Sequence, residues 1–353
     1  MTPSRTVRHR LPAVPTLVLL ALALAVIVIA ACSVGAFPIA TGDTARILLS
    51  GLGLASADGI PSGQQAVLWS IRLPRVVLGV IVGGGLGAAG AAMQALFRNP
   101  LADPSLTGVS GGAALAATSV IVTGVLLAPG AAGVLGVATL PLAAFAGGLA
   151  VSVVVYRLAT RSGHTSIAAL LLAGVAMNAL AEAGIGMFTF IANDDQLRNL
   201  TFWRLGSVAG GTWPMIACVG PAVLIAVIVL VAQALAYDAL ALGEAEAAYL
   251  GVRVERLKAL TLVFCALAAG SAVAVSGMVL FVGLVAPHLV RRFATATHGF
   301  TLLASAATGG TLLLAADVLA RSLIAPQEVP VGVLTALLGG SYLIWLLHRR
   351  RAP

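Results

Sequence analysis

Long apolar runs alternate with short polar segments along the whole chain of 353 residues. A membrane-spanning helix needs about 20 apolar residues, so ten such helices with short connections would fill the chain. The predicted spans cover about residues 14–37, 72–96, 106–127, 140–159, 165–191, 213–235, 254–276, 277–293, 301–321 and 329–348. The pattern predicts an all-α polytopic membrane protein with one transmembrane domain, residues 1–353, that begins with a short inner tail, residues 1–13.

The first apolar run follows the basic tail and has two interpretations. As a signal peptide it would be removed, and residues 29–32 are similar to a lipoprotein cleavage box. Its apolar stretch is longer than that of a signal peptide, however, and nine further predicted spans follow it. We therefore expect an uncleaved first span.

Composition supports the membrane interpretation, because 60% of the residues are hydrophobic and only 9% are charged, against roughly 25% in soluble domains. The net charge of +8 lies in short basic clusters between apolar runs, as the positive-inside rule describes. This distribution argues against a nucleic-acid partner and places both termini inside. The basic residues expected inside are Arg5, Arg8, Arg10, Arg98, Arg157, Arg161, Arg253, Arg256, Lys258, Arg291, Arg292, Arg349, Arg350 and Arg351.

The sequence shows no pattern typical of a disulfide framework, a metal site or a nucleotide-binding loop. Cys32, Cys218 and Cys265 lie in apolar runs, and no Cys or His spacing resembles a disulfide framework or a metal site. The single lysine, Lys258, follows no glycine-rich phosphate loop. The chain is therefore not expected to be an enzyme, and the energy for any transport would come from a partner or an ion gradient.

Residues 72–114 organise the predicted helices. Gly83, Gly87 and Gly90 would let neighbouring helices approach closely. An Asn-Pro and an Asp-Pro pair within residues 99–104 then interrupt the helix. Irregular backbone at membrane depth is tolerated only inside protein or beside water.

One spacing of small residues and proline recurs in the chain. The two sets are Gly83, Gly90 and Pro100, and Gly270, Gly277 and Pro287. They would enter the membrane from opposite sides, as in transporters built from inverted repeats. Three matches in a glycine-rich chain also arise by chance, so both explanations stay open.

Seven segments, in order and spread over nearly the whole chain, carry a family resemblance. They are RLPR at 72–75, Gln94 with NPLADP at 99–104, GVSGGA at 108–113, FWRLGS at 202–207, GLVAPHLVR at 283–291, DVLAR at 317–321 and VPVGV at 329–333. Together they resemble the permease family of type II ABC importers, which bring vitamin B12, ferric siderophores or haem across the bacterial inner membrane.

The resemblance implies the permease fold of ten helices with an inverted repeat, and a homodimer with the pathway at its axis. Two cytoplasmic ATP-binding subunits would hold ATP and magnesium, and a periplasmic binding protein would deliver the ligand. The chain itself would hold no permanent cofactor. It would be embedded in lipid in the inner membrane, with both termini cytoplasmic.

A segment of about residues 240–253 is predicted to be a short helix that fits a groove on the ATPase. Its candidate residues are Gly243, Glu244, Glu246, Ala247, Ala248, Leu250 and Gly251. We expect the two glutamates and two alanines at its surface, and Gly251 at its end. In the family this segment is the coupling helix; the alternative is an ordinary interfacial helix.

Three arginines, Arg72, Arg75 and Arg321, lie on the outer side of the predicted topology. Arginines at the matching family positions meet acidic residues of the binding protein, and such charge pairs set orientation and association rate. The alternative is that they are anchors at helix ends, whose charged heads extend to water.

The fifth predicted span carries polar and sulfur-containing residues that are candidates for the pathway. They are Met177, Asn178, Glu182 and Met187, with Arg198 in the loop that follows. Polar groups inside a span usually face protein or a water-filled cavity. The alternative role of Asn178 and Glu182 is a structural hydrogen bond to a neighbouring helix. The alternative role of the two methionines is to fill gaps in the packing.

Two other classes of protein fit parts of the sequence. An intramembrane serine protease would need Ser110 as nucleophile and His288 as base. An ion-coupled transporter would need mid-membrane acidic residues, and only Glu182 and Asp317 are good candidates. A local ion pair with Arg321, one turn along the helix, would explain Asp317 instead.

The segment 193–198, continued by 201–203, is more similar to haem permeases than to the B12 or siderophore members, so haem is the predicted ligand. A ferric siderophore or B12 stays the alternative. Arg198 or Arg204 would attract the haem propionates, or serve only as scaffold. His288 would be a transient haem ligand or, as we favour, a packing residue at a helix end.

Overall fold

The protein is almost entirely helical in the computed structural model, which describes residues 12–35, 37–124, 139–293, 297–324 and 327–351. The main helices of the bundle are α1 (Ala13–Ser33), α4 (Leu73–Leu96), α5 (Val109–Thr123), α7 (Thr139–Ala159), α8 (Ile167–Ile191), α10 (Trp213–Ala232), α13 (Val254–Ser276), α14 (Val282–Phe293), α15 (His298–Ser322) and α16 (Val331–Arg351). The connecting helices are α2 (Thr41–Gly51), α3 (Ser62–Val67), α9 (Asp194–Leu205), α11 (Ala234–Leu240) and α12 (Glu244–Tyr249). The remaining elements are a π turn (Leu68–Arg72), a 3-10 turn (Pro104–Thr107) and a hairpin of β1 (Thr160–Arg161) and β2 (His164–Thr165).

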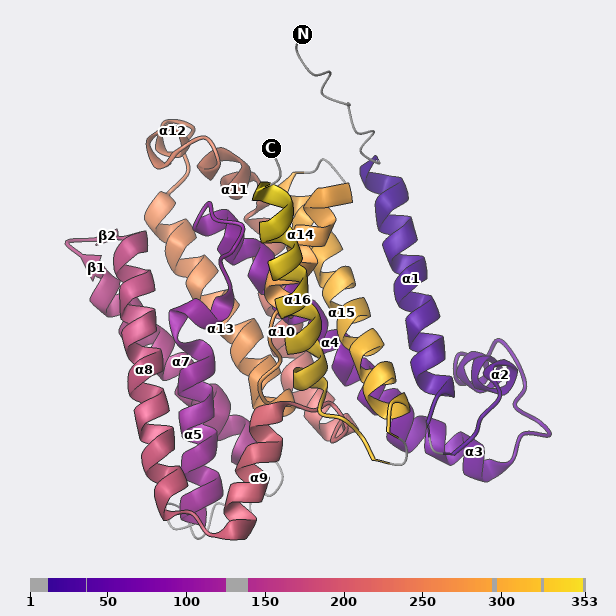
Figure 1. Ribbon diagram of the computed structural model, residues 1–353. Coiled ribbons are helices and arrows are strands. Elements are labelled where there is room, and N and C mark those ends of the chain that lie inside the picture. Colours follow the sequence, from indigo (N-terminus) through magenta and orange to yellow (C-terminus); the bar gives the residue numbers. More distant parts are fainter. Residues whose placement is uncertain (1–11, 36, 125–138, 294–296, 325–326, 352–353) are drawn as a thin grey trace.

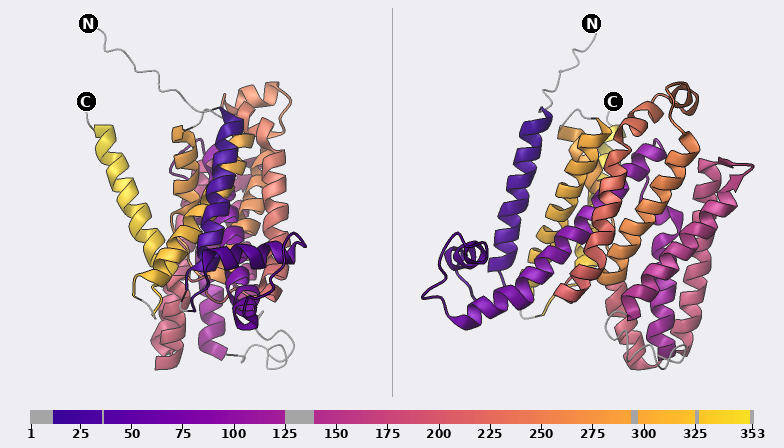
Figure 2. Two further views of the ribbon diagram at one scale, coloured as in Figure 1. Left: turned by 90° about the vertical axis from the view of Figure 1, so that its right-hand side faces the viewer. Right: turned by 180° about the vertical axis from the view of Figure 1, so that it is seen from behind.

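The two ends of the helix bundle carry different elements. Helix α1 begins, and α16 finishes, at the end where α12 lies, whereas α2, α3 and α9 lie at the opposite end (Figure 1). We call these the α12 end and the α9 end. Helix α16 leans away from the rest of the bundle as it approaches the α12 end (Figure 2).

Each of the ten predicted spans overlaps one helix of the bundle. Among the described residues, seven helices are long and apolar enough to cross a membrane: α1, the continuous helix Ser62–Leu96, α7, α8, α10, α13 and α15. Helices α5 and α16 are shorter but apolar, and α14 has 12 residues. The end of the third predicted span, beyond residue 124, lies outside the described residues. The all-α, multi-pass architecture is confirmed.

The connection after α8 differs from the expected loop. Residues 194–205 form α9, and its first turn is closed by a capping box. The Asn193 side chain accepts the Gln196 N–H at 2.9 Å, and the Gln196 side chain accepts the Asn193 N–H at 3.0 Å. The loop prediction was wrong because low hydropathy does not distinguish a loop from a polar helix, whereas this capping pattern does.

Helix α4 lies at the centre of the bundle. It is the main part of the continuous helix Ser62–Leu96, in which 78% of an apolar stretch of 18 residues is buried. Its glycines bring its backbone against the backbones of α15 and α14. A Cβ atom on Gly83, Gly87 or Gly90 would overlap a backbone carbonyl oxygen of one of these helices. The close approach inferred for these three glycines is therefore present, and it depends on the missing side chains.

Replacing Gly87 by valine should separate α4 from α15, because the new side chain would meet the carbonyl group of Ser305. Overpacking of this kind should lower the free energy of unfolding by about 3 kcal/mol. Thermal unfolding of the chain purified in detergent measures the loss. The matched control is Gly186→Val on α8, where an added Cβ meets nothing within 4 Å. Equal stability of the two variants would contradict this account of the packing.

Candidate functional site

At the α12 end, α12 is a six-residue helix between two glycines with positive φ angles. Gly243 has a φ of +142° and Gly251 a φ of +86°. The Gly251 N–H donates to the Ala248 carbonyl, and the Val252 N–H to the Ala247 carbonyl, each at 3.0 Å. These bonds satisfy carbonyls that have no partner within the helix. Gly251 therefore ends the helix.

The outward side of α12 combines one charge with apolar groups. Glu246 and Ala248 are exposed, as are Tyr249 (91%) and Leu250 (64%). We call these four residues the α12 surface. A small helix with an exposed aromatic ring and aliphatic groups suits a groove on a partner protein.

The expectation that both alanines lie at the surface is wrong for Ala247, which is fully buried. Ala247 lies one turn after Glu244, whose side chain turns back toward the bundle. The Glu244 carboxylate accepts a hydrogen bond from Lys258 Nζ of α13 at 2.8 Å. This ion pair holds one side of α12 against the bundle and leaves the other side free.

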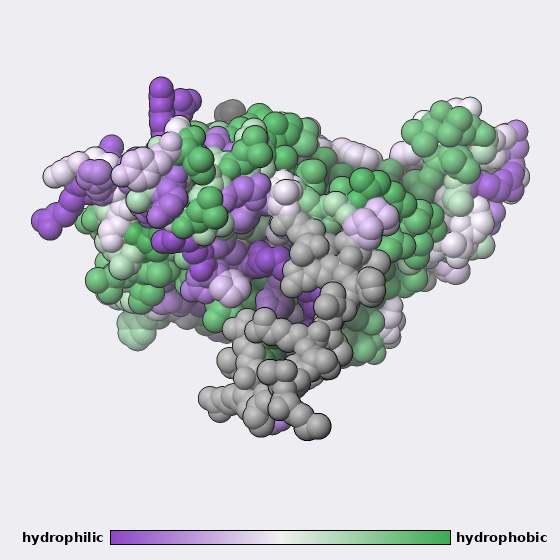
Figure 3. All heavy atoms as spheres, turned by 90° about the horizontal axis from the view of Figure 1, so that it is seen from above, coloured by the Kyte–Doolittle hydropathy of each residue, from purple (hydrophilic) through white to green (hydrophobic). Residues whose placement is uncertain are grey.

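The surface at the α12 end is basic and hydrophilic. Figure 3 looks down on this end and shows hydrophilic side chains gathered on it beside apolar ones. The exposed arginines at the α12 end of the bundle are Arg98, Arg157, Arg161, Arg253 and Arg256. This end therefore carries the basic residues that the positive-inside pattern assigns to one side of the membrane.

At the α9 end, an ionic cluster joins α4, α15 and the segment before α16. Arg75 of α4 donates to Asp317 of α15 at 2.7 Å and to both carboxylate oxygens of Glu328 at 2.9 Å. Arg321 Nε lies 3.2 Å from the second oxygen of Asp317, which is the local ion pair considered above. Asp317 is 1% exposed, and two arginines compensate its burial. It is therefore not a free site for a coupling ion.

Arg321, together with Arg72, also binds the carbonyl end of α1. Arg72 donates to the carbonyl oxygens of Cys32 and Ser33, both at 2.7 Å. Arg321 donates to that of Val34 at 2.9 Å. The last carbonyls of a helix lack intrahelical partners and carry partial negative charge. The two guanidinium groups therefore fasten α1 to the bundle.

These contacts leave little of the arginines at the surface. Arg72 is 5% exposed and Arg321 9%, whereas the Glu328 side chain is 42% exposed. Sequence reasoning missed Glu328; an acidic residue directly before the last apolar run was the available signal. Docking of a partner by Arg72, Arg75 and Arg321 stays a prediction.

The five candidate pathway residues do not form one continuous lining. Asn178 donates to the Ser105 carbonyl at 3.0 Å, which is the structural hydrogen bond held open as the alternative. Met177 beside it is partly buried and packs against the apolar core. Both side chains therefore support the connection between α4 and α5.

The other candidates lie nearer the α9 end and are more exposed. Glu182 pairs with Arg204 of α9 at 3.0 Å, and Arg198 pairs with Asp195 at 2.8 Å. Met187 is 70% exposed on α8. Glu182 thus accepts hydrogen bonds from Arg204 and connects α8 to α9, which is the structural alternative considered for it above.

Ser110 lines a cavity of about 240 Å³ together with Asp103. Asp103 accepts a hydrogen bond from the Ser105 N–H at 2.9 Å. His288 is not among the lining residues; its ring lies 5.7 Å from that of Tyr342, edge to face. The cavity therefore gives no support to a serine protease.

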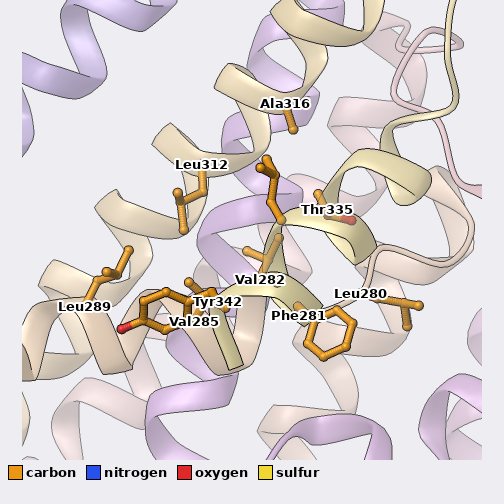
Figure 4. A pocket seen from close by; sticks show the side chains of 11 residues that line it. Leu280, Phe281, Val282, Val285, Leu289, Leu312, Ala316, Thr335 and Tyr342 are labelled. Atoms are coloured by element: carbon orange, nitrogen blue, oxygen red, sulfur yellow. The ribbon is translucent and has the colours of Figure 1, made fainter. Parts of the chain in front are cut away.

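A second cavity, of about 250 Å³, lies between α14, α15 and α16 (Figure 4). Aliphatic and aromatic side chains line it, including Phe281, Leu289 and Leu312, with Thr335 and Tyr342 as its polar members. Among the described residues, no charged side chain lines this cavity, so those residues offer nothing to orient a charged ligand.

Comparisons with known proteins agree along nearly the whole chain. The model of the FecCD transport family matches residues 22–349. The chain is 46% identical over 319 residues to the hemin transport system permease HmuU of Yersinia pestis, covering 86% of this chain and 94% of that protein. It is 40% identical over 292 residues to the cobalamin import system permease BtuC of Halobacterium salinarum, covering 83% and 76%.

A solved structure, described as an inward-facing ABC transporter of the metal-chelate type, shares the fold. It has a TM-score of 0.79 and 27% identity, and the match covers 95% of this chain and 99% of that one. Family, relatives and fold therefore agree: the chain belongs to the FecCD transport family and is the permease, a transport subunit, of an ABC importer.

Proposed function

We propose that the chain carries haem across the bacterial inner membrane, received from a periplasmic binding protein and driven by ATP hydrolysis in a separate subunit. The observation that carries the choice of ligand is the 46% identity to a hemin permease over 94% of that protein. The 40% identity to a cobalamin permease supports the second candidate, in which the ligand is B12; a ferric siderophore is the remaining alternative.

The α12 surface is the proposed contact with the ATP-binding subunits, which would hold ATP and magnesium. The chain's own sequence offers no phosphate loop around its single lysine, so nucleotide chemistry is assigned to the partner. The exposed arginines at the α12 end support a cytoplasmic position for it. Both termini would then be cytoplasmic as well, since α1 begins and α16 finishes at this end (Figure 1).

Helix α8 supports the proposal of a homodimer. Among its exposed side chains are Leu172 (73%), Val175 (59%), Leu180 (64%) and Met187 (70%). A second copy of the chain would cover part of this apolar surface and enclose a pathway at the dimer axis. Met187 and the Glu182 salt bridge would then lie beside the transported ligand.

Uptake by the complex in liposomes, with its ATP-binding and binding-protein partners, tests the proposed function. We expect ATP-dependent accumulation of haem at least about tenfold faster than of B12 or a ferric siderophore, which equals about 1.4 kcal/mol of discrimination. Faster uptake of B12 would select the second candidate. Uptake that needs an ion gradient and no ATP would refute an ABC importer.

Removing the Tyr249 side chain tests the α12 surface. Tyr249→Ala should weaken binding of the ATP-binding subunit by about 2 kcal/mol, because exposed aromatic residues dominate such contacts. Titration of the subunit into the permease in nanodiscs measures the affinity. Phe202→Ala, which removes an aromatic ring that is 59% exposed on α9, is the control. If both variants bound as tightly as the parent, α12 would not be the docking site.

Charge changes at the α9 end test docking of the binding protein. If acidic groups of the binding protein approach Arg75, then Arg75→Met should slow association, and Glu328→Gln should speed it. Both effects should shrink as salt rises. Stopped-flow association at two ionic strengths measures them. The control is Arg46→Met, since Arg46 is an exposed arginine on α2 that donates to the Ser56 and Asp58 carbonyls rather than to the cluster. Rates that are equal in all variants at low salt would rule out docking through this cluster.

A further inference from the structure

Lys258, the single lysine of the chain, is buried near the start of α13, with 3% of its side chain exposed. Its Nζ donates to Glu244 Oε2 at 2.8 Å, to the Thr165 carbonyl at 3.0 Å and to Glu255 Oε1 at 3.1 Å. An ammonium group has three N–H donors. All three are therefore used inside the protein.

The three acceptors belong to different elements. Glu244 is the first residue of α12, Glu255 belongs to α13, and Thr165 is the last residue of β2, directly before α8. Glu255 Oε2 also accepts the Thr165 N–H at 2.8 Å. Lys258 and Glu255 therefore hold the Thr165 residue by both its N–H and its carbonyl group.

Helix α8 starts immediately beyond this clamp. Ser166 caps it by accepting the Ala169 N–H at 3.3 Å, and regular helix begins at Ile167. A displacement of Thr165 would therefore pass directly into the helix. Helix α8 also carries the exposed apolar face proposed to border the pathway.

We infer that Lys258 is a positioning residue, the joint through which a movement of α12 reaches α8. The inference rests on the proposed function, because a partner ATPase bound at the α12 surface would supply the movement. Without the ammonium group, the Glu244 and Glu255 carboxylates would face each other without a cation between them. Helix α12 would then lose its tie to α8 and move alone.

A measurement of distance tests the joint in the assembled complex. Spin labels at A245C on α12 and H164C on the hairpin report whether α12 moves together with the start of α8. Cys218→Ser is included because Cys218 is exposed, whereas Cys32 and Cys265 are buried. Variants of the ATP-binding subunits without cysteine are used, so that only the two chosen positions are labelled. Distances are recorded without nucleotide and with ATP trapped by vanadate, and ligand uptake per ATP is measured on the same complexes without labels.

In the parent complex we expect the distance to stay the same with and without ATP. In Lys258→Met it should shift or broaden when ATP is trapped, and uptake per ATP should fall about fivefold or more, the usual range of coupling between sites. Arg256→Met removes an exposed cation two residues away from Lys258. It should change neither the dependence of the distance on ATP nor the uptake per ATP. Loss of packing alone would not make the distance depend on nucleotide.

Glu244→Ala cuts only the tie between Lys258 and α12, so it gives a second test if Lys258→Met fails to assemble. It should reproduce the nucleotide-dependent distance, and adding it to Lys258→Met should cost nothing more, because both act through one contact. Unchanged distance and unchanged uptake per ATP in Lys258→Met, or in Glu244→Ala when the former does not assemble, would overturn the inference. Absence of ATP-dependent uptake in the parent complex would instead refute the proposed function.

Discussion

Contact between the backbones of α4, α15 and α14 is the constraint on which the rest of the structure depends. Lipid chains are as apolar as leucine, so helices in a membrane associate through close packing rather than through the hydrophobic effect. The glycines of α4 allow this packing, because a Cβ atom at Gly83, Gly87 or Gly90 would overlap a neighbouring carbonyl group. With α4 and α15 fixed in this way, Arg75 and Asp317 meet at 2.7 Å.

Buried charges then join the helices at both ends of the bundle. At the α9 end, Arg75 and Arg321 enclose Asp317, and Arg72 and Arg321 hold the last carbonyls of α1. At the α12 end, Lys258 has all its partners within the chain. A buried ion is tolerated only when it is paired and hydrogen-bonded, so removal of one partner affects every element that the cluster joins. These clusters tie together elements that lie far apart in the sequence.

Most of the architecture could be predicted from the sequence, because span length and hydropathy depend on local composition. Which side chains pair with one another within the chain could not be predicted. Arg75 and Glu328 are 253 positions apart, and no local pattern reveals that they meet. The burial of Ala247 was equally hidden in the sequence, because tertiary contacts, such as the pair of Glu244 with Lys258, decide which side of α12 faces the bundle. Helix α9 is a different case, because its capping box, Asn193 and Gln196, is visible in the sequence, whereas its low hydropathy is equally typical of a loop.

The proposed function requires that the α12 end face the cytoplasm, where a separate subunit would act on it. The most direct test is the labelling of Glu246→Cys, in a Cys218→Ser background, by a maleimide that cannot cross the membrane. The reagent is added to right-side-out spheroplasts and to inside-out vesicles. The account predicts labelling only in the inside-out vesicles. Labelling in intact spheroplasts would place α12 on the outer side and contradict it.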